Sequence, residues 1–240
     1  MLTEKLLTLI FPVKCAVCEK ETEGAARNKL ICSGCLKNFS PSTSFYCPLC
    51  QAKSLAGEVC FSCLPAAKSK FWLDRLLSPF SYKEPSVKKM IKAFKYDFIE
   101  GLAGPIGKLM SRYLDKIKEE IDFKDYVVVP TPLHKIKFNR RGYNQSELIA
   151  AEVAKHLNLE TASDLILKTK PTKDQASLKE EIRNENVKGA FICLKPESVS
   201  GKKILLVDDV YTTGATMNEC ARILKQAGAA EVWGLVIARG

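Results

Sequence analysis

The sequence predicts an α/β protein in which a mostly parallel sheet is flanked by helices, with a small cysteine-rich module in front of it. Two observations carry this prediction. From Leu73 onward, short apolar runs alternate with amphipathic segments, which is typical of a parallel sheet covered on both faces. Eight of the ten cysteines lie between Cys15 and Cys63, so the first quarter of the chain is stabilised differently from the rest. We therefore expect two units, residues 1–68 and residues 69–240.

Four Cys-x-x-Cys motifs follow one another in the N-terminal unit. Their cysteines are Cys15 and Cys18, Cys32 and Cys35, Cys47 and Cys50, and Cys60 and Cys63. Each motif places two thiolates on one side of a tight bend, and two motifs together complete a tetrahedral zinc site. The eight cysteines thus predict two zinc ions in a double zinc ribbon. The simplest pairing joins neighbouring motifs, and a crossed pairing is the alternative. Four thiolates fill the coordination shell, so both ions would be structural.

Iron–sulfur clusters and disulfides are the other common uses of such cysteines. Regular paired motifs favour zinc over a cluster, and disulfides need an oxidising compartment. Residues 1–12 carry an early acid and no small-residue cleavage pattern, so they are interpreted as a packing helix and not as a signal peptide. No stretch reaches the ~18 apolar residues that span a bilayer. We expect a cytoplasmic protein without a membrane span.

Hydrophobic periodicity locates the elements of the C-terminal unit. Val87, Met90, Ile91 and Phe94 form one face of a predicted helix, and the β-branched run Tyr126–Pro130 predicts a buried strand. Helices are expected at residues 86–94, 106–121, 144–157 and 215–227, and strands at residues 126–130, 165–168, 190–193, 204–207 and 232–238. The polar segment 170–188 is longer than an ordinary connection, which favours an active-site lid over a disordered linker.

The segment that carries most of the functional information is the strand, loop and helix over residues 203–216. Asp208 and Asp209 follow an apolar strand, and ligands bind beyond the carboxyl ends of parallel strands. The next residues, Thr212, Thr213, Gly214, Ala215 and Thr216, begin a helix, whose N-terminus attracts an anion. The loop suits a 5′-phosphate, and the acids suit ribose hydroxyls, directly or through water on Mg²⁺. A Walker B element is the rival interpretation, but no Walker A sequence accompanies it.

Residues 207–216, Val-Asp-Asp-Val-Tyr-Thr-Thr-Gly-Ala-Thr, resemble the phosphoribosyl diphosphate motif of type I phosphoribosyltransferases. Nearly the whole chain resembles the ComF family of competence-associated proteins. The resemblance rests on the four cysteine motifs, residues 129–135, residues 140–145, Gln175, Arg183, Asn186 and the acidic motif. It implies a type I phosphoribosyltransferase fold preceded by a double zinc ribbon.

The resemblance also implies roles for individual residues. Asp208 and Asp209 would contact ribose, the loop from Thr212 to Thr216 would bind the 5′-phosphate, and residues 131–135 would form the diphosphate loop. In that loop Thr131 and Lys135 would bind diphosphate. His134 is either a general acid or base or a positioning group, and Lys135 is a candidate catalytic cation. Residues 170–188 would be the flexible catalytic loop.

The formal charge of +10 favours an anionic partner. Basic residues gather between Tyr126 and Ser146, a segment without acids, where Arg140, Arg141 and Tyr143 suit either single-stranded nucleic acid or a diphosphate, or form an ordinary solvated surface. Two functions follow as hypotheses. One is the transfer of a ribosyl 5-phosphate group to an acceptor that the sequence does not identify. The other is a DNA-uptake factor that binds single-stranded DNA and a helicase partner and uses the phosphoribosyl site as a ligand sensor.

Overall fold

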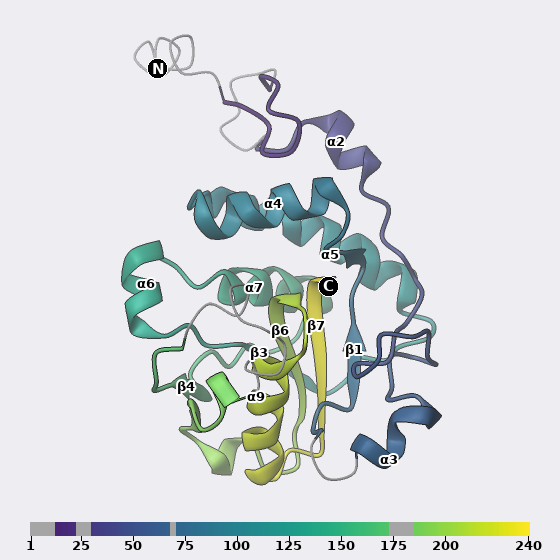
Figure 1. Ribbon diagram of the computed structural model, residues 1–240, viewed down its shortest axis with the longest axis vertical. Helices are drawn as coiled ribbons and strands as arrows, with labels where there is room; N and C mark the ends of the chain where they lie inside the picture. The colour runs from purple at the N-terminus through teal and green to yellow at the C-terminus, as the bar shows by residue number, and fades with distance from the viewer. Residues whose placement is uncertain (1–12, 23–29, 68–70, 173–184) are drawn as a thin grey trace.

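The computed structural model describes residues 13–22, 30–67, 71–172 and 185–240. Its centre is a parallel sheet whose strands lie in the order β1 (Arg75–Leu77), β7 (Glu231–Arg239), β6 (Lys203–Tyr211) and β3 (Tyr126–Pro130). A short strand, β2 (Phe80–Ser81), pairs with the end of β7 on the same side as β1. All these pairings are parallel, so the carboxyl ends of the strands meet at one edge of the sheet (Figure 1).

Helices cover both faces of this sheet, as the sequence predicts. Helices α5 (Ala103–Ile117) and α7 (Gln145–Leu157) lie on one face, and α9 (Ala215–Gln226) lies on the other. Side chains of β6 alternate between the two cores, since Leu205 faces α5 and α7 while Leu206 faces α9. This alternation confirms that the apolar run before the acids is a strand buried on both sides.

Helix α4 (Pro85–Tyr96) lies across the end of the sheet where the strands finish (Figure 1). Its apolar face is completely buried, and it begins with a proline in the first turn, where a missing N–H costs nothing. The single-turn 3₁₀ helix η2 (Glu100–Leu102) connects it to α5. Because α4 crosses the carboxyl ends of the strands, residues near its C-terminus lie next to the end of β6.

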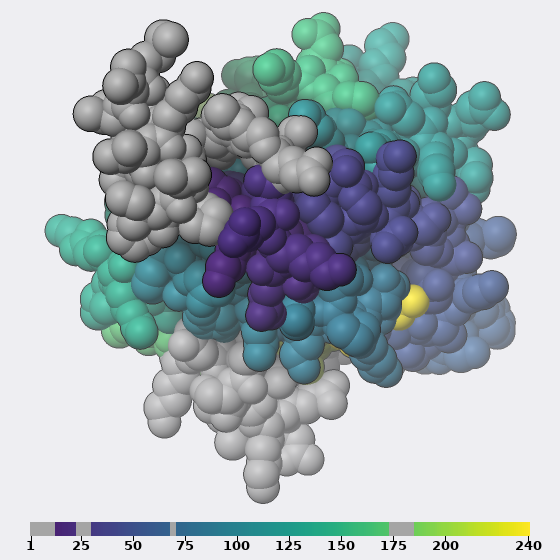
Figure 2. Space-filling model, turned by 90° about the horizontal axis from the view of Figure 1, so that it is seen from above, coloured from purple at the N-terminus to yellow at the C-terminus, as the bar shows by residue number. Residues whose placement is uncertain are grey.

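The N-terminal module wraps around this domain. Its first part, residues 13–22 with α2 (Ser33–Asn38), lies over α4, and Cys15 and Val17 belong to the same core as α4 and α5 (Figures 1 and 2). Its second part, which ends in η1 (Phe61–Cys63) and α3 (Leu64–Ala67), runs along β1. There Gly57 accepts a hydrogen bond from the Leu76 N–H at 2.9 Å.

Gly57 is the position at which the module depends on a glycine. Its φ is +82°, and a Cβ would lie 2.4 Å from the Leu76 carbonyl oxygen. Only glycine combines this backbone conformation with so close an approach. The second part of the module is therefore fitted to the edge of the sheet.

The structure differs from the sequence prediction at several elements, among them β1 and β2, for which the sequence predicts no strand. The strands β4 (Ile166–Lys168) and β5 (Phe191–Cys193) pair with each other in antiparallel orientation. They form a separate two-stranded sheet and do not join the parallel sheet. The short helix α6 (Lys135–Arg141) begins at the last residue of the predicted loop 131–135 and continues through a segment for which the sequence predicts no element. A 3₁₀ turn, η4 (Pro196–Ser198), precedes β6. The expected packing helix at residues 1–12 and most of the expected lid, residues 173–184, lie outside the described residues.

The division into units 1–68 and 69–240 stays a prediction. No helix in the described ranges has both the length and the apolar character that crossing a membrane requires.

Candidate functional site

The candidate site begins where β3 and β6 end side by side. Pro130 pairs with Val207 in the sheet, and the Thr131 N–H continues the ladder by donating to the Val207 carbonyl at 2.8 Å. This parallel register brings Thr131, which follows β3, beside Asp208, which lies near the end of β6. The two segments that sequence reasoning assigned to diphosphate and ribose therefore meet at one point.

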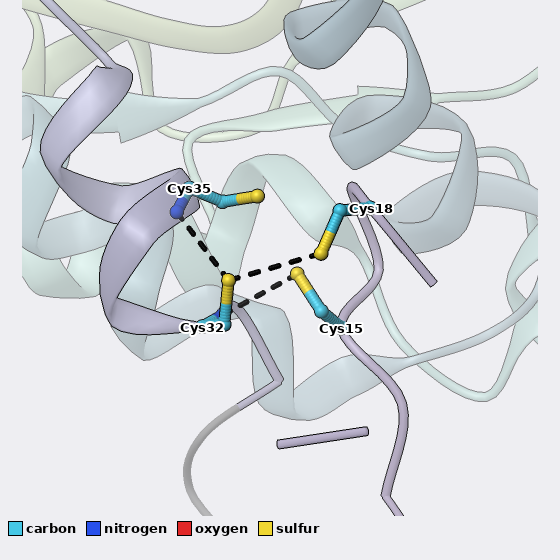
Figure 3. Close-up of side chains that lie close together, drawn as sticks. All are labelled: Cys15, Cys18, Cys32 and Cys35. Atoms are coloured by element: carbon cyan, nitrogen blue, oxygen red, sulfur yellow. Dashed lines mark hydrogen bonds between the residues drawn. The ribbon is translucent and has the colours of Figure 1, made fainter. Parts of the chain in front are cut away.

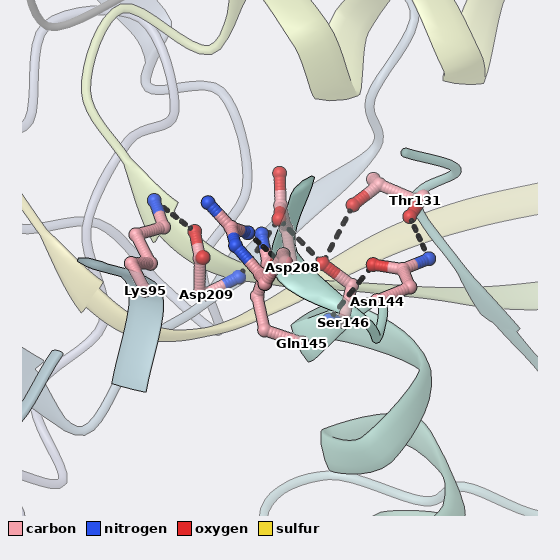
Figure 4. Close-up of polar contacts among 8 residues, drawn as sticks. Lys95, Thr131, Asn144, Gln145, Ser146, Asp208 and Asp209 are labelled. Atoms are coloured by element: carbon pink, nitrogen blue, oxygen red, sulfur yellow. Dashed lines mark hydrogen bonds and ion pairs between the residues drawn. The ribbon is translucent and has the colours of Figure 1, made fainter. Parts of the chain in front are cut away.

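A chain of hydrogen bonds joins these two strands to α7 (Figure 4). The Thr131 hydroxyl donates to the Ser146 hydroxyl at 3.0 Å, and the Ser146 hydroxyl donates to Asp208 Oδ1 at 2.8 Å. The same carboxylate oxygen accepts the backbone N–H of Asp209 at 2.9 Å. Two donors, the Ser146 hydroxyl and the Asp209 N–H, thus orient the Asp208 carboxylate, and Thr131 orients the Ser146 hydroxyl.

Asn144 fixes the start of α7 against the loop after β3. It is the N-cap of the helix, with its side-chain oxygen accepting the Ser146 N–H at 3.2 Å. Its amide group donates to the Thr131 carbonyl at 3.0 Å. Because Asn144 and Ser146 are both buried, the cap and the acid network form one rigid unit.

Lys95, near the C-terminus of α4, forms an ion pair with Asp209. Its ammonium lies 2.8 Å from Asp209 Oδ1, and the Asp209 side chain is 3% exposed (Figure 4). The other carboxylate oxygen, Asp209 Oδ2, is buried without a hydrogen-bond partner among the described residues. A buried, unsatisfied carboxylate oxygen is costly, so this atom is an acceptor that a ligand hydroxyl would satisfy.

The charged groups of this cluster shift the pKa values of Asp208 and Lys95. Burial raises the pKa of Asp208 to about 6, and the neighbouring Asp209 carboxylate acts in the same direction. Burial would lower the pKa of Lys95, but the carboxylates of Asp209 and Asp208 outweigh it and hold that pKa above its ordinary value. Lys95 is therefore charged at neutral pH and offsets part of the repulsion between the two acids.

The loop after β6 leads into the N-terminus of α9. Gly214 is the N-cap residue with φ +76°, and a Cβ there would lie 2.0 Å from the Tyr211 hydroxyl oxygen. A side chain at this position would be excluded both by the backbone and by the tyrosine ring. The first N–H groups of a helix have no partner within the helix, so the loop presents donors and a favourable dipole to an anion.

These segments surround one pocket. Both acids line it, together with the loop after β6 and the start of the loop after β3. Four cationic side chains also line it, namely Lys95, Lys137, Arg141 and Lys168. Arg141 lies in the last turn of α6 and donates to the side chain of Gln145. A pocket with two acids on its floor and several cations around it suits a ligand that carries both hydroxyls and phosphates.

Most of the residues that the sequence predicted for this site line the pocket. They are Thr131, Arg141, Asp208, Asp209, Thr212, Thr213, Gly214, Ala215 and Thr216. Thr172, just before the undescribed part of the expected lid, is buried and also lines it. The structure thus brings together segments that are widely separated in the sequence.

Four predicted residues do not line the pocket. His134 is the N-cap of α6, and its Nδ1 accepts the Ile136 N–H at 3.3 Å, which gives this histidine a local structural function. Lys135 and Arg140 are exposed on α6. Tyr143 is buried, stacks on Phe94 with 5.6 Å between ring centroids, and donates its hydroxyl to the Phe94 carbonyl.

Sequence reasoning missed several residues that line the pocket. Lys95, Tyr82 and Tyr96 come from α4 and the turn before it, and the sequence analysis assigned them no function. No local motif marks them, because they reach the site only through the way α4 crosses the sheet. Asn144 and Ser146 did carry a signal, since an asparagine before an amphipathic run is a helix N-cap pattern.

The cysteines form two separate clusters of four. One contains Cys15, Cys18, Cys32 and Cys35, and the other contains Cys47, Cys50, Cys60 and Cys63. In each cluster the ligand sulfur atoms all lie within 4.8 Å of one another. Figure 3 shows the first cluster, with its four side chains pointing toward one another. Neighbouring motifs therefore pair, and the crossed arrangement does not occur.

Both clusters fit zinc. Four sulfur atoms ~2.3 Å from a tetrahedral ion stand about 3.8 Å apart. The distance between the Cys18 and Cys32 sulfur atoms is 3.8 Å, and that between the Cys50 and Cys60 sulfur atoms is 3.7 Å. The geometry of both tetracysteine sites is thus that of a structural zinc ribbon.

Backbone N–H groups prepare two of these thiols for a metal. Burial opposes ionisation of Cys15, but N–H groups led by that of Cys18 outweigh it and lower the pKa of Cys15 to about 6. The same balance, led by the Cys50 N–H, lowers the pKa of Cys47 to about 7. Thiolates are the form that binds zinc, so each site begins with one ligand that ionises readily. The remaining two cysteines lie outside the clusters, Cys220 buried in the core and Cys193 half-buried on β5.

This combination of fold and site defines a phosphoribosyltransferase-type α/β protein that carries a double zinc ribbon. Comparison with known families agrees, since a phosphoribosyl transferase domain model matches residues 144–239 and a double zinc ribbon domain model matches residues 6–64. The chain belongs to the competence protein F (ComF) family. Competence protein F of Haemophilus influenzae is 30% identical over 231 residues, which are 94% of this chain and 97% of the relative.

Other relatives show the same full-length similarity. The DNA utilization protein YhgH of Escherichia coli is 29% identical over 85% of this chain and 88% of its own length. Competence protein ComFC of Bacillus subtilis is 28% identical over 83% of this chain and 80% of its own length. Among solved structures, the allosteric regulatory enzyme of purine biosynthesis matches 56% of this chain and 26% of its own with a TM-score of 0.38, too low to add to the assignment.

The two tetracysteine sites predict about two zinc ions per chain, measured by elemental analysis of protein purified without added metal. Replacing Cys35 with serine should remove about one ion, because three thiolates bind zinc less tightly than four. Replacing Cys193, which lies outside both sites, should remove none. A wild-type protein with less than one zinc per chain and freely titrating thiols would contradict the assignment.

Proposed function

We propose that the pocket at the ends of β3 and β6 binds phosphoribosyl diphosphate. The observation that carries this proposal is the Asp208–Asp209 pair directly before a glycine-containing loop at the start of α9, in which Asp209 is buried with one carboxylate oxygen unsatisfied. Vicinal ribose hydroxyls are the neutral donors that two adjacent carboxylates accept. A 5′-phosphate on the same sugar would then reach the loop of Thr212, Thr213 and Thr216.

The cations around the pocket suit the other end of this ligand. Lys137 and Arg141 on α6 and Lys168 on β4 line the same pocket as Thr131. A diphosphate carries several negative charges, and cationic side chains at a partly buried site hold such a group far more strongly than in water. The ligand would thus lie with its phosphate on α9, its sugar on the acids and its diphosphate towards α6.

The acids also fit Mg²⁺, which we propose accompanies the ligand. Carboxylate oxygens are hard ligands of the kind that Mg²⁺ prefers, and the half-buried Asp208 faces the pocket where ribose and diphosphate would meet. When bound, Mg²⁺ would neutralise charge on the diphosphate. Lys95 would hold the Asp209 carboxylate in place from the opposite side.

Binding of this ligand serves either of two activities. As a transferase, the protein would hold the anomeric carbon against an acceptor while cations stabilise the charge that develops on the departing diphosphate. As a sensor, it would bind the same ligand without transfer. Diphosphate release, with water or a nucleobase as the acceptor, indicates the transferase, whereas tight binding without release indicates the sensor.

We further propose that the protein acts in DNA uptake, as the names of its relatives indicate for them: competence protein F and competence protein ComFC. A cytoplasmic location suits the cysteines, since thiols stay reduced there and remain available to bind zinc. The function in DNA uptake would involve incoming single strands and a helicase that processes them.

A specific feature of α6 favours contact with single-stranded DNA. Lys135 and Arg140 are exposed there, and Phe138 is 42% exposed between them. Basic groups that follow phosphates and a ring that stacks on bases are the elements of single-strand binding. The last residue of the helix, Arg141, lines the phosphoribosyl pocket, so a strand on α6 would lie beside the pocket mouth.

Exchanging both acids for asparagines, Asp208→Asn with Asp209→Asn, should weaken binding of phosphoribosyl diphosphate by about 100-fold, since two charge-assisted hydrogen bonds become neutral ones. Isothermal titration with Mg²⁺ present measures the effect. The matched control is Asp122→Asn with Asp125→Asn, which makes the same charge change at exposed positions before β3. Unchanged affinity in the first variant would show that the site is assigned to the wrong residues.

Reversing the charge of Lys135 and Arg140, each to glutamate, should weaken binding of a single-stranded oligonucleotide. It should also reduce the slope of log affinity against log salt by about 1.4, which corresponds to two lost phosphate contacts. Affinity for phosphoribosyl diphosphate should stay the same, because neither residue lines the pocket. The control reverses Lys124 and Lys202, two exposed lysines elsewhere. Equal loss in both variants would mean that α6 has no specific contact with DNA.

A further inference from the structure

The second tetracysteine site lies directly against the loop that we assign to the 5′-phosphate. We call residues 45–67 the second ribbon and residues 211–216 the phosphate loop. Tyr211, which is 1% exposed at the end of β6, donates its hydroxyl to the Pro48 carbonyl at 2.8 Å. Pro48 lies between the zinc-ligand positions Cys47 and Cys50. The turn that presents two of the four thiolates is therefore also a hydrogen-bond partner of the phosphate loop.

A second contact joins the same turn to the next residue of the loop. The Gln51 side-chain amide donates to the Thr212 carbonyl at 3.0 Å. Gln51 has a positive φ of 60°, and its own N–H closes the turn on the Cys47 carbonyl at 2.9 Å. Because Gln51 is held in this conformation by the turn around Cys47, the direction of its side chain depends on the folded metal site.

A third contact fixes the second ribbon to the strand beside the loop. The Arg239 guanidinium lies 3.3 Å from the centroid of the Tyr46 ring, and Arg239 pairs with Tyr211 in the sheet. The Gly240 N–H donates to the Tyr211 carbonyl at 2.7 Å. The yellow atoms of the C-terminus accordingly lie beside the blue atoms of the N-terminal module in Figure 2.

The Tyr211 side chain contacts both the second ribbon and the phosphate loop. A Cβ on Gly214 would lie 2.0 Å from the Tyr211 hydroxyl oxygen, so the end of the ring packs directly against Gly214. The same hydroxyl is bonded to Pro48. The ring is thus held between the cysteine turn and the glycine that lets the loop enter α9, and it cannot shift without moving both.

The first tetracysteine site has different neighbours. Glu19, next to Cys18, forms an ion pair with Lys89 on α4 at 3.0 Å. The Leu36 carbonyl, next to Cys35, accepts from Arg112 on α5 at 3.3 Å. Neither contact involves the phosphate loop, so the first site is an internal control for the second.

We propose that the second tetracysteine site, once folded around its metal, holds the phosphate loop in its binding conformation. Zinc at this site and a phosphate-bearing ligand at the loop then stabilise each other. The coupling to ligand rests on the proposed function, whereas the ordering of the loop does not. Tyr211 and Gln51 are the positioning residues. By thermodynamic linkage the effect is reciprocal, because a metal that strengthens ligand binding is itself bound more tightly when the ligand is present.

Hydrogen exchange of the peptide that covers residues 211–216 tests the ordering without any ligand. Cys63→Ser, which removes a thiolate from the second site, should speed exchange in this peptide, while the matched change Cys35→Ser in the first site should not. Tyr211→Phe and Gln51→Ala leave all eight thiolates in place and test the contacts if Cys63→Ser does not fold. Tyr211→Phe should keep two zinc ions and still speed the exchange of this peptide.

Zinc release to a coloured chelator tests the coupling to phosphoribosyl diphosphate. Saturating ligand should slow release of one of the two zinc ions by about five-fold or more, and Tyr211→Phe should abolish this protection. The same variant should bind the ligand about three- to ten-fold more weakly, since it leaves a buried carbonyl without its donor.

The outcomes separate this proposal from the proposed function. A wild-type protein that does not bind the ligand would refute the proposed function and the coupling, and the exchange experiment would still decide whether the second site orders the loop. A wild-type protein that binds the ligand, with exchange and zinc release unchanged in every variant and condition, would overturn the proposal alone.

Discussion

Two carboxylates stand side by side at the end of β6, and a single lysine balances them. The Lys95 ammonium lies 2.8 Å from Asp209 in a nearly buried position. Buried charges of one sign are tolerated only when an opposite charge lies close, so the acids require α4 to cross the sheet where it does. The first part of the N-terminal module, residues 13–22 with α2, packs on α4 and α5 and covers the outer side of α4. Helix α4 and the first part of the module that packs on it thus hold the Lys95 ammonium next to the two carboxylates.

The zinc module supports the two halves of the pocket separately. Its first site rests on the helix that supplies Lys95, through the pair of Glu19 and Lys89. Its second site rests on the loop after β6, through the bond from Tyr211 to Pro48. A module of this length has too few apolar residues to hold such positions by itself, and metal binding supplies the missing folding free energy. The cysteines are therefore part of the framework of the pocket, although they lie outside it.

The sequence predicted the features that depend on local pattern. The apolar run before Asp208 identified the central strand, and the spacing of the cysteines identified two tetracysteine sites. The threonines and Gly214 marked the loop that leads into α9 and lines the pocket, and its binding of an anion stays a prediction. It could not predict Lys95, because that contact depends on the angle at which a helix crosses a sheet, and no local motif records an angle. It also could not give the partners of β4 and β5, since a strand of only three residues suits either direction of pairing. The helix α6 did have a signal in the glycine that ends it, Gly142 with φ +86°.

Carboxyl-carbon NMR of Asp208 and Asp209 across pH tests the central claim most directly. The account predicts an apparent pKa of about 6 for Asp208 in the free protein, because burial and Asp209 both favour its neutral form. Changing Lys95 to methionine should raise that pKa further, and phosphoribosyl diphosphate with Mg²⁺ should lower it, since hydroxyl donors and a cation favour the carboxylate. An Asp208 carboxyl that titrates at its ordinary value, and that responds neither to Lys95→Met nor to the ligand, would contradict the account.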